Sequence, residues 1–239
     1  MSPAVLPQNA ATVILVRAAA DGGLEVLMNR RPEEMRFLGG FYVFPGGNVK
    51  PEDSRGDILQ RCVGLSVADA QRLLGSELGP ELSLAHWVAA TRELFEEVGI
   101  LLAVDETGKP VTARAETLQQ ALREYRHRVL DQTMAFADFL AAVRLSCDLK
   151  HLAYFSHWQT PEEFSMRFDT RFFLAPLPEG QIPIATSREV AESLWLSPEH
   201  ALTSYRKGQL PLIFPTYASL RALADFDSFE SLCTEYRLR

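Results

Sequence analysis

Residues 89–101, AATRELFEEVGIL, constrain the fold of this chain most, because they combine a helical repeat with a cluster of acids. On a helix, Glu93, Glu96 and Glu97 lie at i, i+3 and i+4, so their side chains emerge on one face. A second set of residues follows a 4-3-4 spacing that gives the same helix a face to bury. This set is Trp87, Thr91, Leu94 and Val98. The stretch therefore predicts an amphipathic helix that carries three carboxylates.

Two interpretations of the acids are open at this point: a solvated helix face, or a cluster that binds a cation. Like charges at this spacing repel by a few tenths of a kcal/mol per pair, and a divalent cation would remove that cost. Gly99 is placed to end the helix in a left-handed turn, so the acids lie at the end where the helix dipole disfavours negative charge. Upstream, FPGG at residues 44–47 is a glycine pair of the kind that lets the backbone approach an ion or phosphate. Both features favour a cation site.

Together, FPGG and RELFEEVGI resemble the Nudix box, whose pattern is G, five residues, E, seven residues, REUxEExGU, with U aliphatic. The second half matches at every defined position: Arg92, Glu93, Leu94, Glu96, Glu97, Gly99 and Ile100. In the first half, the sixth residue after Gly47 is Asp53 rather than glutamate, and 38 residues instead of seven separate it from Arg92. The box therefore contains a 31-residue insertion, as in the interrupted-box subgroup that includes coenzyme A diphosphatases.

Upstream of the box, the chain resembles the motif of coenzyme A-cleaving Nudix enzymes in spacing more than in identity. The spacing of the motif is kept from residue 27 to FPGG, and Leu27, Arg31, Arg36 and Gly40 also match it in identity. Met28, Asn29 and Pro32 occupy motif positions but differ from the residues of the pattern. Residues 157–174 also resemble the interrupted-box enzymes. The resemblance implies that Arg31, Arg36 and Phe44 contact substrate, the arginines through phosphate. The alternative is that these arginines pair with nearby surface acids.

The resemblance also implies a metal site and catalytic roles. The implied ligands of Mg²⁺ or Mn²⁺ are the carbonyl of Gly46 and the side chains of Glu93, Glu96 and Glu97. Arg92 would orient the carboxylates, with Asp53 as its partner across the insertion. Glu93 or Glu189 would be the general base, and the sequence does not choose between them. Glu192 is a second candidate for the acid that reaches back from the later chain, and an exposed loop glutamate is the alternative for Glu189.

The activity implied is metal-dependent hydrolysis of the pyrophosphate bond of coenzyme A or acyl-coenzyme A. Its products would be adenosine 3',5'-bisphosphate and (acyl-)phosphopantetheine. One alternative within the same class is a pyrophosphatase acting on ADP-ribose, NADH or another dinucleotide. An alternative from another class is a Nudix module that senses a nucleotide without cleaving it, although the complete REUxEE set argues against it.

Composition limits the partners of the chain. The formal charge of −7 argues against a nucleic-acid surface and leaves a small nucleotide as the expected substrate. No long apolar run and no basic-then-apolar start is present, so we expect no membrane partner and a cytoplasmic location. Cys62, Cys147 and Cys233 are far apart in the sequence and odd in number, which predicts neither a disulfide framework nor a zinc site.

The expected architecture is an α/β Nudix fold, a mixed sheet between helices, formed by residues 1–239 as one domain. The insertion, residues 54–84, would lie beside the active-site mouth or at the interface of a homodimer, and residues 112–146 would add extra helices. Strands are predicted at residues 11–18, 24–29, 41–44, 100–104, 152–158, 167–175 and 189–196, and residues 21–23, Asp-Gly-Gly, predict a hairpin turn between the first two strands. Helices are predicted at residues 57–62, 66–75, 116–129, 134–143, 216–224 and 228–236.

Overall fold

The structure of the chain, a computed structural model, describes residues 5–112, 116–184 and 187–238, without the side chains of 116–119 and 121. Its helices are α1 (Gly56–Leu59), α2 (Val67–Leu74), α3 (Pro80–Val98), α4 (Glu116–Leu130), α5 (Phe136–Ala142), α6 (Pro198–Arg206), α7 (Phe214–Leu223) and α8 (Phe229–Tyr236), with 3-10 turns η1 (Pro51–Ser54) and η2 (Leu149–His151). Its strands are β1 (Gln8–Ala18), β2 (Leu24–Arg30), β3 (Tyr42–Val43), β4 (Gly46–Asn48), β5 (Cys62–Val63), β6 (Ala103–Val104), β7 (Ser146–Asp148), β8 (Ala153–Gln159), β9 (Phe168–Pro176) and β10 (Glu192–Leu196).

A mixed seven-stranded sheet forms the centre of the molecule, in the order β10-β2-β1-β9-β8, with β3 paired to β2 and β4 paired to β1. The predicted hairpin is confirmed, because β1 and β2 pair antiparallel around a turn in which Gly22 has a φ of +84°. On its other side β1 runs parallel to β9. The first half of β1 also pairs with β4, which carries Gly46 and Gly47. The glycine pair is therefore part of the sheet.

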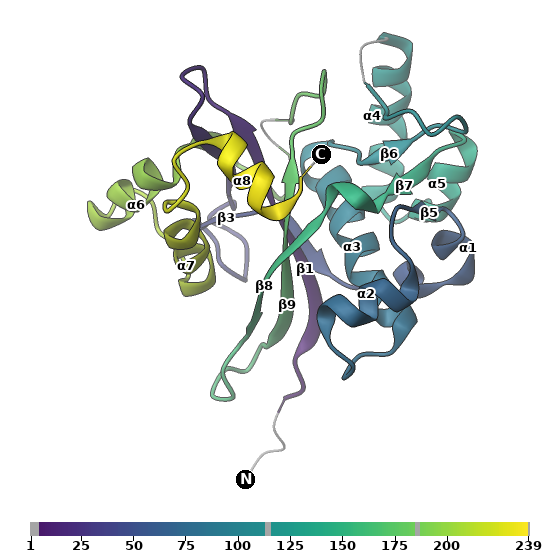
Figure 1. Cartoon of the computed structure of the whole chain (residues 1–239). Helices are drawn as coiled ribbons and strands as arrows, with labels where there is room; N and C mark the ends of the chain where they lie inside the picture. Colours follow the sequence, from purple (N-terminus) through teal and green to yellow (C-terminus); the bar gives the residue numbers. More distant parts are fainter. Residues whose placement is uncertain (1–4, 113–115, 185–186, 239) are drawn as a thin grey trace.

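Helices cover both faces of this sheet (Figure 1), and each face has its own apolar cluster. Successive residues of β1 point to opposite faces, so Val13 and Leu15 join the cluster around α3, whereas Ile14 and Val16 join the cluster under α6, α7 and α8. All four are fully buried. The predicted α/β architecture with a sheet between helices is confirmed.

The insertion is folded into the α3 side of the molecule. It contributes α1, β5 and α2, and α2 begins as predicted, with the Ser66 hydroxyl accepting a hydrogen bond from the backbone of Asp69. The helix predicted at residues 57–62 is shorter, because the chain turns into β5 and pairs with β7 in a second sheet of order β5-β7-β6. This pairing places Cys62 opposite Cys147, although they are distant in the sequence, and both thiols are free.

Two predicted strands are shorter than expected. The strand predicted at residues 100–104 is reduced to β6, because the backbone of Leu101 is hydrogen-bonded to the side chain of Gln181 through both its N–H and its C=O. The strand predicted from residue 189 begins at Glu192, because Ser187 and Val190 close a tight turn that leaves Glu189 in a loop. Among the described helices, none has the length and apolar character needed to cross a membrane.

Candidate active site

Helix α3 carries the acids and ends where the sequence predicts. Pro80 occupies its first turn, after Gly79, and Gly99 ends the helix with a φ of +71° and donates its N–H to the carbonyl of Phe95. The predicted buried face is confirmed, since Trp87, Thr91, Leu94 and Val98 are each at most 1% exposed. The ring of Trp87 lies 4.8 Å from that of Phe173 in β9, which fixes the rotation of the helix against the sheet.

The three glutamates of the box are also buried. Glu93, Glu96 and Glu97 are 8%, 6% and 4% exposed. The interpretation of these residues as a solvated helix face is therefore wrong, because the segments before the insertion fold over that face. Buried carboxylates need partners, since an isolated buried charge is strongly destabilising.

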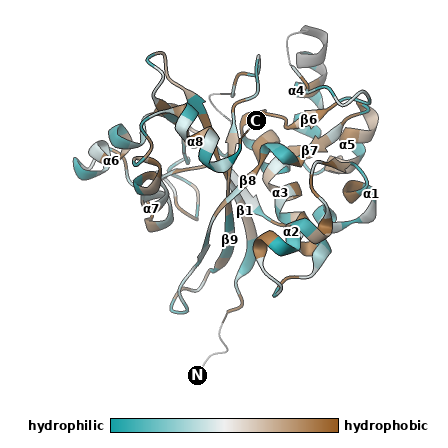
Figure 2. Ribbon diagram, viewed as in Figure 1, coloured by the Kyte–Doolittle hydropathy of each residue, from teal (hydrophilic) through white to brown (hydrophobic). Residues whose placement is uncertain are grey.

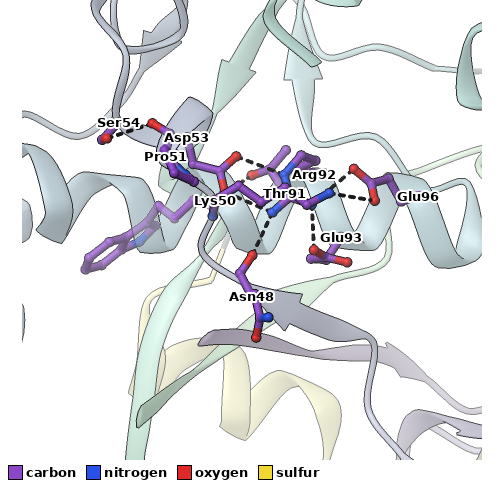
Figure 3. Close-up of polar contacts among 10 residues, drawn as sticks. Asn48, Lys50, Pro51, Asp53, Ser54, Thr91, Arg92, Glu93 and Glu96 are labelled. Atoms are coloured by element: carbon purple, nitrogen blue, oxygen red, sulfur yellow. Dashed lines mark hydrogen bonds and ion pairs between the residues drawn. The ribbon is translucent and has the colours of Figure 1, made fainter. Parts of the chain in front are cut away.

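Arg92 is the main partner of the acids (Figure 3). Its Nε and Nη2 donate to the two carboxylate oxygens of Asp53 at 2.8 and 2.9 Å, which confirms the expected pair across the insertion. Its Nη1 donates to Glu93 and, at 3.0 Å, to Glu96, and its Nη2 also donates to the carbonyl of Asn48. Burial acts to lower the pKa of Arg92, but Asp53, Glu93 and Glu96 hold it well above the usual value. The guanidinium is thus a fixed cation that positions two of the glutamates.

The glycine pair lies directly against the acids. A Cβ added at Gly47 would lie 2.6 Å from the carboxyl carbon of Glu93, so any other residue here would displace this carboxylate. The backbone of Gly46 also lies close enough to the carboxylate of Glu97 to act on its pKa, which it lowers. The two halves of the box therefore meet at one place despite the insertion between them.

Glu97 lies in the most negative part of the site. Burial raises its pKa well above the usual value, and the neighbouring carboxylates of Glu93 and Glu189 raise it further. Arg31 and the Gly46 backbone act in the opposite direction. Glu189 thus acts on Glu97 from its loop. Glu192 is instead engaged elsewhere, because it accepts a hydrogen bond from the hydroxyl of Tyr42 at 2.8 Å.

The predicted substrate residues lie in different surroundings. Arg31 is partly buried near Glu97, and its Nε is buried without a hydrogen-bond partner among the described residues. Arg36 is exposed. Phe44 is only 3% exposed and packs in the apolar cluster under α6, α7 and α8, so its side chain is a core residue. Of the three, Arg31 lies where a phosphate beside the acids would need a cation.

Two further cations at the site were not identified from the sequence. Arg126 of α4 is 4% exposed and donates from Nε to the carbonyl of Phe95 and from Nη2 to that of Glu97, at 3.0 and 2.8 Å. It donates to two carbonyls at the end of α3, where the dipole is negative. Lys50 places its Nζ 3.6 Å from Glu96. No local pattern marks either residue, because each reaches the site only through tertiary packing.

The donor atoms suit a hard divalent cation, which prefers oxygen ligands. Glu93 and Glu189 act electrostatically on the buried Glu97, and Gly47 lies directly against the carboxylate of Glu93. In the described part of the chain, however, no three acids converge closely enough to form a ready cation site. The reason is visible in the hydrogen bonds, since Arg92 holds Glu93 and Glu96.

A sheet between helices, with a glycine strand against an acidic helix end, is the arrangement of a Nudix hydrolase. The crystal structure of a NUDIX hydrolase from Alicyclobacillus acidocaldarius is 31% identical, with a TM-score of 0.76, and the match covers 97% of this chain and 96% of that one. Residues 7–223 match the NUDT19 Nudix domain family, and the chain belongs to that family.

Among curated relatives, the acyl-coenzyme A diphosphatase NUDT19 of Gallus gallus is 28% identical over 97% of this chain and 72% of its own length. The Homo sapiens protein of the same name is 29% identical over 88% of this chain. The chain spans only 63% of the human relative and 62% of the Xenopus laevis relative.

Proposed function

We propose that the chain hydrolyses the pyrophosphate bond of coenzyme A or an acyl-coenzyme A, giving adenosine 3',5'-bisphosphate and (acyl-)phosphopantetheine. The observation that carries the proposal is the close approach of the Gly46–Gly47 strand to Glu93 and Glu97, because it brings the two halves of the interrupted box together. The choice of substrate is supported by the names of the chicken and human relatives and by the spacing of the residues upstream of the box.

Nudix hydrolases generally use divalent metal ions, and we propose Mg²⁺ or Mn²⁺ for this chain. Glu93, Glu96, Glu97 and the carbonyl of Gly46 would hold the ion. The crowded negative charge that raises the pKa of Glu97 is the charge that a cation would offset. When bound, the ion supplies charge neutralisation at the phosphate oxygens of the substrate.

The side chains of the site then have separate tasks. Arg92 positions Glu93 and Glu96 and is itself held by Asp53. Arg31 would bind a phosphate of the substrate, which would give its buried Nε a partner. Arg36, which is exposed, would contact an outer phosphate.

The reaction forms a bond between a water oxygen and one phosphorus of the pyrophosphate. The bond between that phosphorus and the bridging oxygen breaks, and the other phosphate leaves with the bridging oxygen. A carboxylate must accept the proton of the attacking water. Glu93 and Glu189 are the candidates, and both lie close enough to Glu97 to raise its pKa.

Product analysis tests the proposal. The protein is incubated with coenzyme A, octanoyl-coenzyme A, ADP-ribose or NADH, each with Mg²⁺, with Mn²⁺ or with excess EDTA, and products are identified by mass spectrometry. We expect the two named products in equal amounts, only when metal is present. A larger kcat/KM for ADP-ribose or NADH than for either coenzyme A substrate would reject the substrate assignment. Nucleotide binding without any metal-dependent cleavage would indicate a sensing module instead.

Assembly and location are separate proposals. We propose a homodimer in solution, and sedimentation equilibrium of the purified chain tests it, with a monomer mass at all concentrations as the contradicting result. A cytoplasmic location is likewise proposed, and fluorescence microscopy of the tagged native protein in its own cell tests it.

A further inference from the structure

A cavity of about 450 Å³ lies beside the acidic site, between the insertion and helices α4 and α5. Arg92 and Glu96 form part of its wall, so the cavity opens from the same cluster that contains the box glutamates. Its volume falls within the roughly 300–1,000 Å³ of small-molecule sites. The start of the insertion and the added helices α4 and α5 therefore border a space next to the proposed reaction centre.

Part of the wall of this cavity is apolar. It is formed by Ile58 of α1, Val129 of α4 and Phe136 of α5, and Figure 2 shows α5 mainly in the brown of hydrophobic residues. Much of the remaining lining is charged or polar, and includes Lys50, Glu52, Asp53, Arg55, Asp57, Arg92, Glu96 and Gln132. A ligand that suits this space combines hydrogen-bonding groups with an apolar part.

Arg31 and Glu97 are not among the residues that line this cavity. Arg31 lies near Glu97 with a buried Nε that has no partner among the described residues, which suits a phosphate group. A smaller cavity of about 240 Å³ lies past the end of α3, lined by residues that include Gly99 and Arg126, but its described lining contains none of the box glutamates. A substrate cleaved at the carboxylates therefore meets the cation of Arg31 at Glu97 and the larger cavity at Glu96.

We propose that this cavity binds the pantetheine arm of the substrate, with any acyl chain lying along its apolar wall, while the nucleotide half lies on the Arg31 side. The inference rests on the proposed function and deepens it. The arm carries amides and a hydroxyl, which the charged and polar side chains of the lining can hydrogen-bond, and an acyl tail would contact the apolar wall. The insertion and the added helices then determine substrate specificity, in addition to supporting α3.

Filling the cavity without touching the acids tests the inference. Ala137 of α5 is half-buried and lines the cavity, so Ala137→Phe places a ring inside it without removing a contact. Ala141→Phe makes the same change on an exposed position of the same helix, outside the described lining, and serves as the control. Isothermal titration calorimetry of the metal-loaded proteins measures the Kd of phosphopantetheine and of adenosine 3',5'-bisphosphate separately.

We expect Ala137→Phe to weaken phosphopantetheine binding by about tenfold and to leave adenosine 3',5'-bisphosphate binding unchanged, with no effect of Ala141→Phe on either. Unchanged binding of phosphopantetheine would place the arm elsewhere and overturn the inference. An equal loss for both products would show a disturbed acidic site, which also overturns it. Thermal unfolding verifies that the variants are folded.

A second variant covers a failure of Ala137→Phe to fold. Met134→Ala enlarges the same cavity, and we expect the ratio of kcat/KM for palmitoyl- over acetyl-coenzyme A to rise by about threefold or more. An unchanged ratio overturns the inference. Failure of the proposed function is distinguishable, because it appears as an absence of coenzyme A cleavage by the wild-type protein, whichever product the cavity binds.

Discussion

Replacing Asp53 with asparagine removes one charge from the buried pair that ties the start of the insertion to α3. Asp53 is 2% exposed, receives two hydrogen bonds from Arg92 at 2.8 and 2.9 Å, and receives a third from the backbone of Lys50 at 2.8 Å. Breaking a buried ion pair from one side costs about 3–5 kcal/mol. Because Arg92 keeps Glu93 and Glu96 as partners, we expect Asp53→Asn to lower the free energy of unfolding by about 3 kcal/mol, at the low end of this range.

Urea unfolding followed by circular dichroism measures this loss. Asp57→Asn is the matched control, because it makes the same change in the same segment at an exposed pair, where Arg55 lies 2.7 Å from Asp57. Exposed pairs contribute about 0–1 kcal/mol. If the two variants lose the same free energy, the buried pair does not anchor the insertion and the reasoning is refuted.

Three further predictions concern the acids, the glycine pair and a buried histidine. Glu97→Gln should lower turnover by about a thousandfold without lowering the unfolding temperature, since it removes a charge crowded by other acids; near-normal turnover would exclude Glu97 from the mechanism. Gly47→Ala should reduce activity sharply, because its Cβ would lie 2.6 Å from the carboxyl carbon of Glu93, whereas Gly56→Ala meets nothing within 4 Å; equal activities would contradict this. Burial lowers the pKa of His86 from 6.5 to about 4. The contribution of the neutral imidazole to the free energy of unfolding is therefore fully present above pH 6.5 and is lost as the pH falls toward 4. Between pH 7 and pH 4 the wild type should lose up to about 3 kcal/mol more than His86→Gln in urea titrations, and parallel pH curves would count against this assignment.

Local rules of sequence predicted the parts of the site that lie within one element. The end of α3 at Gly99 follows from the left-handed conformation that glycine allows, and the buried face of the helix follows from its spacing. The pair of Asp53 and Arg92 was predicted from the resemblance to the interrupted box, because both positions belong to one motif. The hairpin of β1 and β2 was predicted from its turn residues.

Features that depend on distant segments could not be predicted in this way. The parallel pairing of β1 with β9 joins strands that are far apart in the sequence, and Arg126 reaches α3 from another helix. Periodicity placed the glutamates on one face but gave no information on what covers that face. The burial of Glu93 and Glu96, and the contact between Lys50 and Glu96, follow from the tertiary fold.

Strand β5, which belongs to the insertion, is the parallel neighbour of β7, so the insertion cannot be removed to give a Nudix box of the usual length without changing this small sheet. Deleting residues 54–84 would remove the parallel neighbour of β7 and leave backbone N–H and C=O groups on that edge unpaired. Unpaired edge groups can pair with a strand of another molecule. It would also empty the positions of Ile58 and Ala70 in the packed interior beside α3. A shortened version would therefore precipitate rather than act as a minimal catalyst.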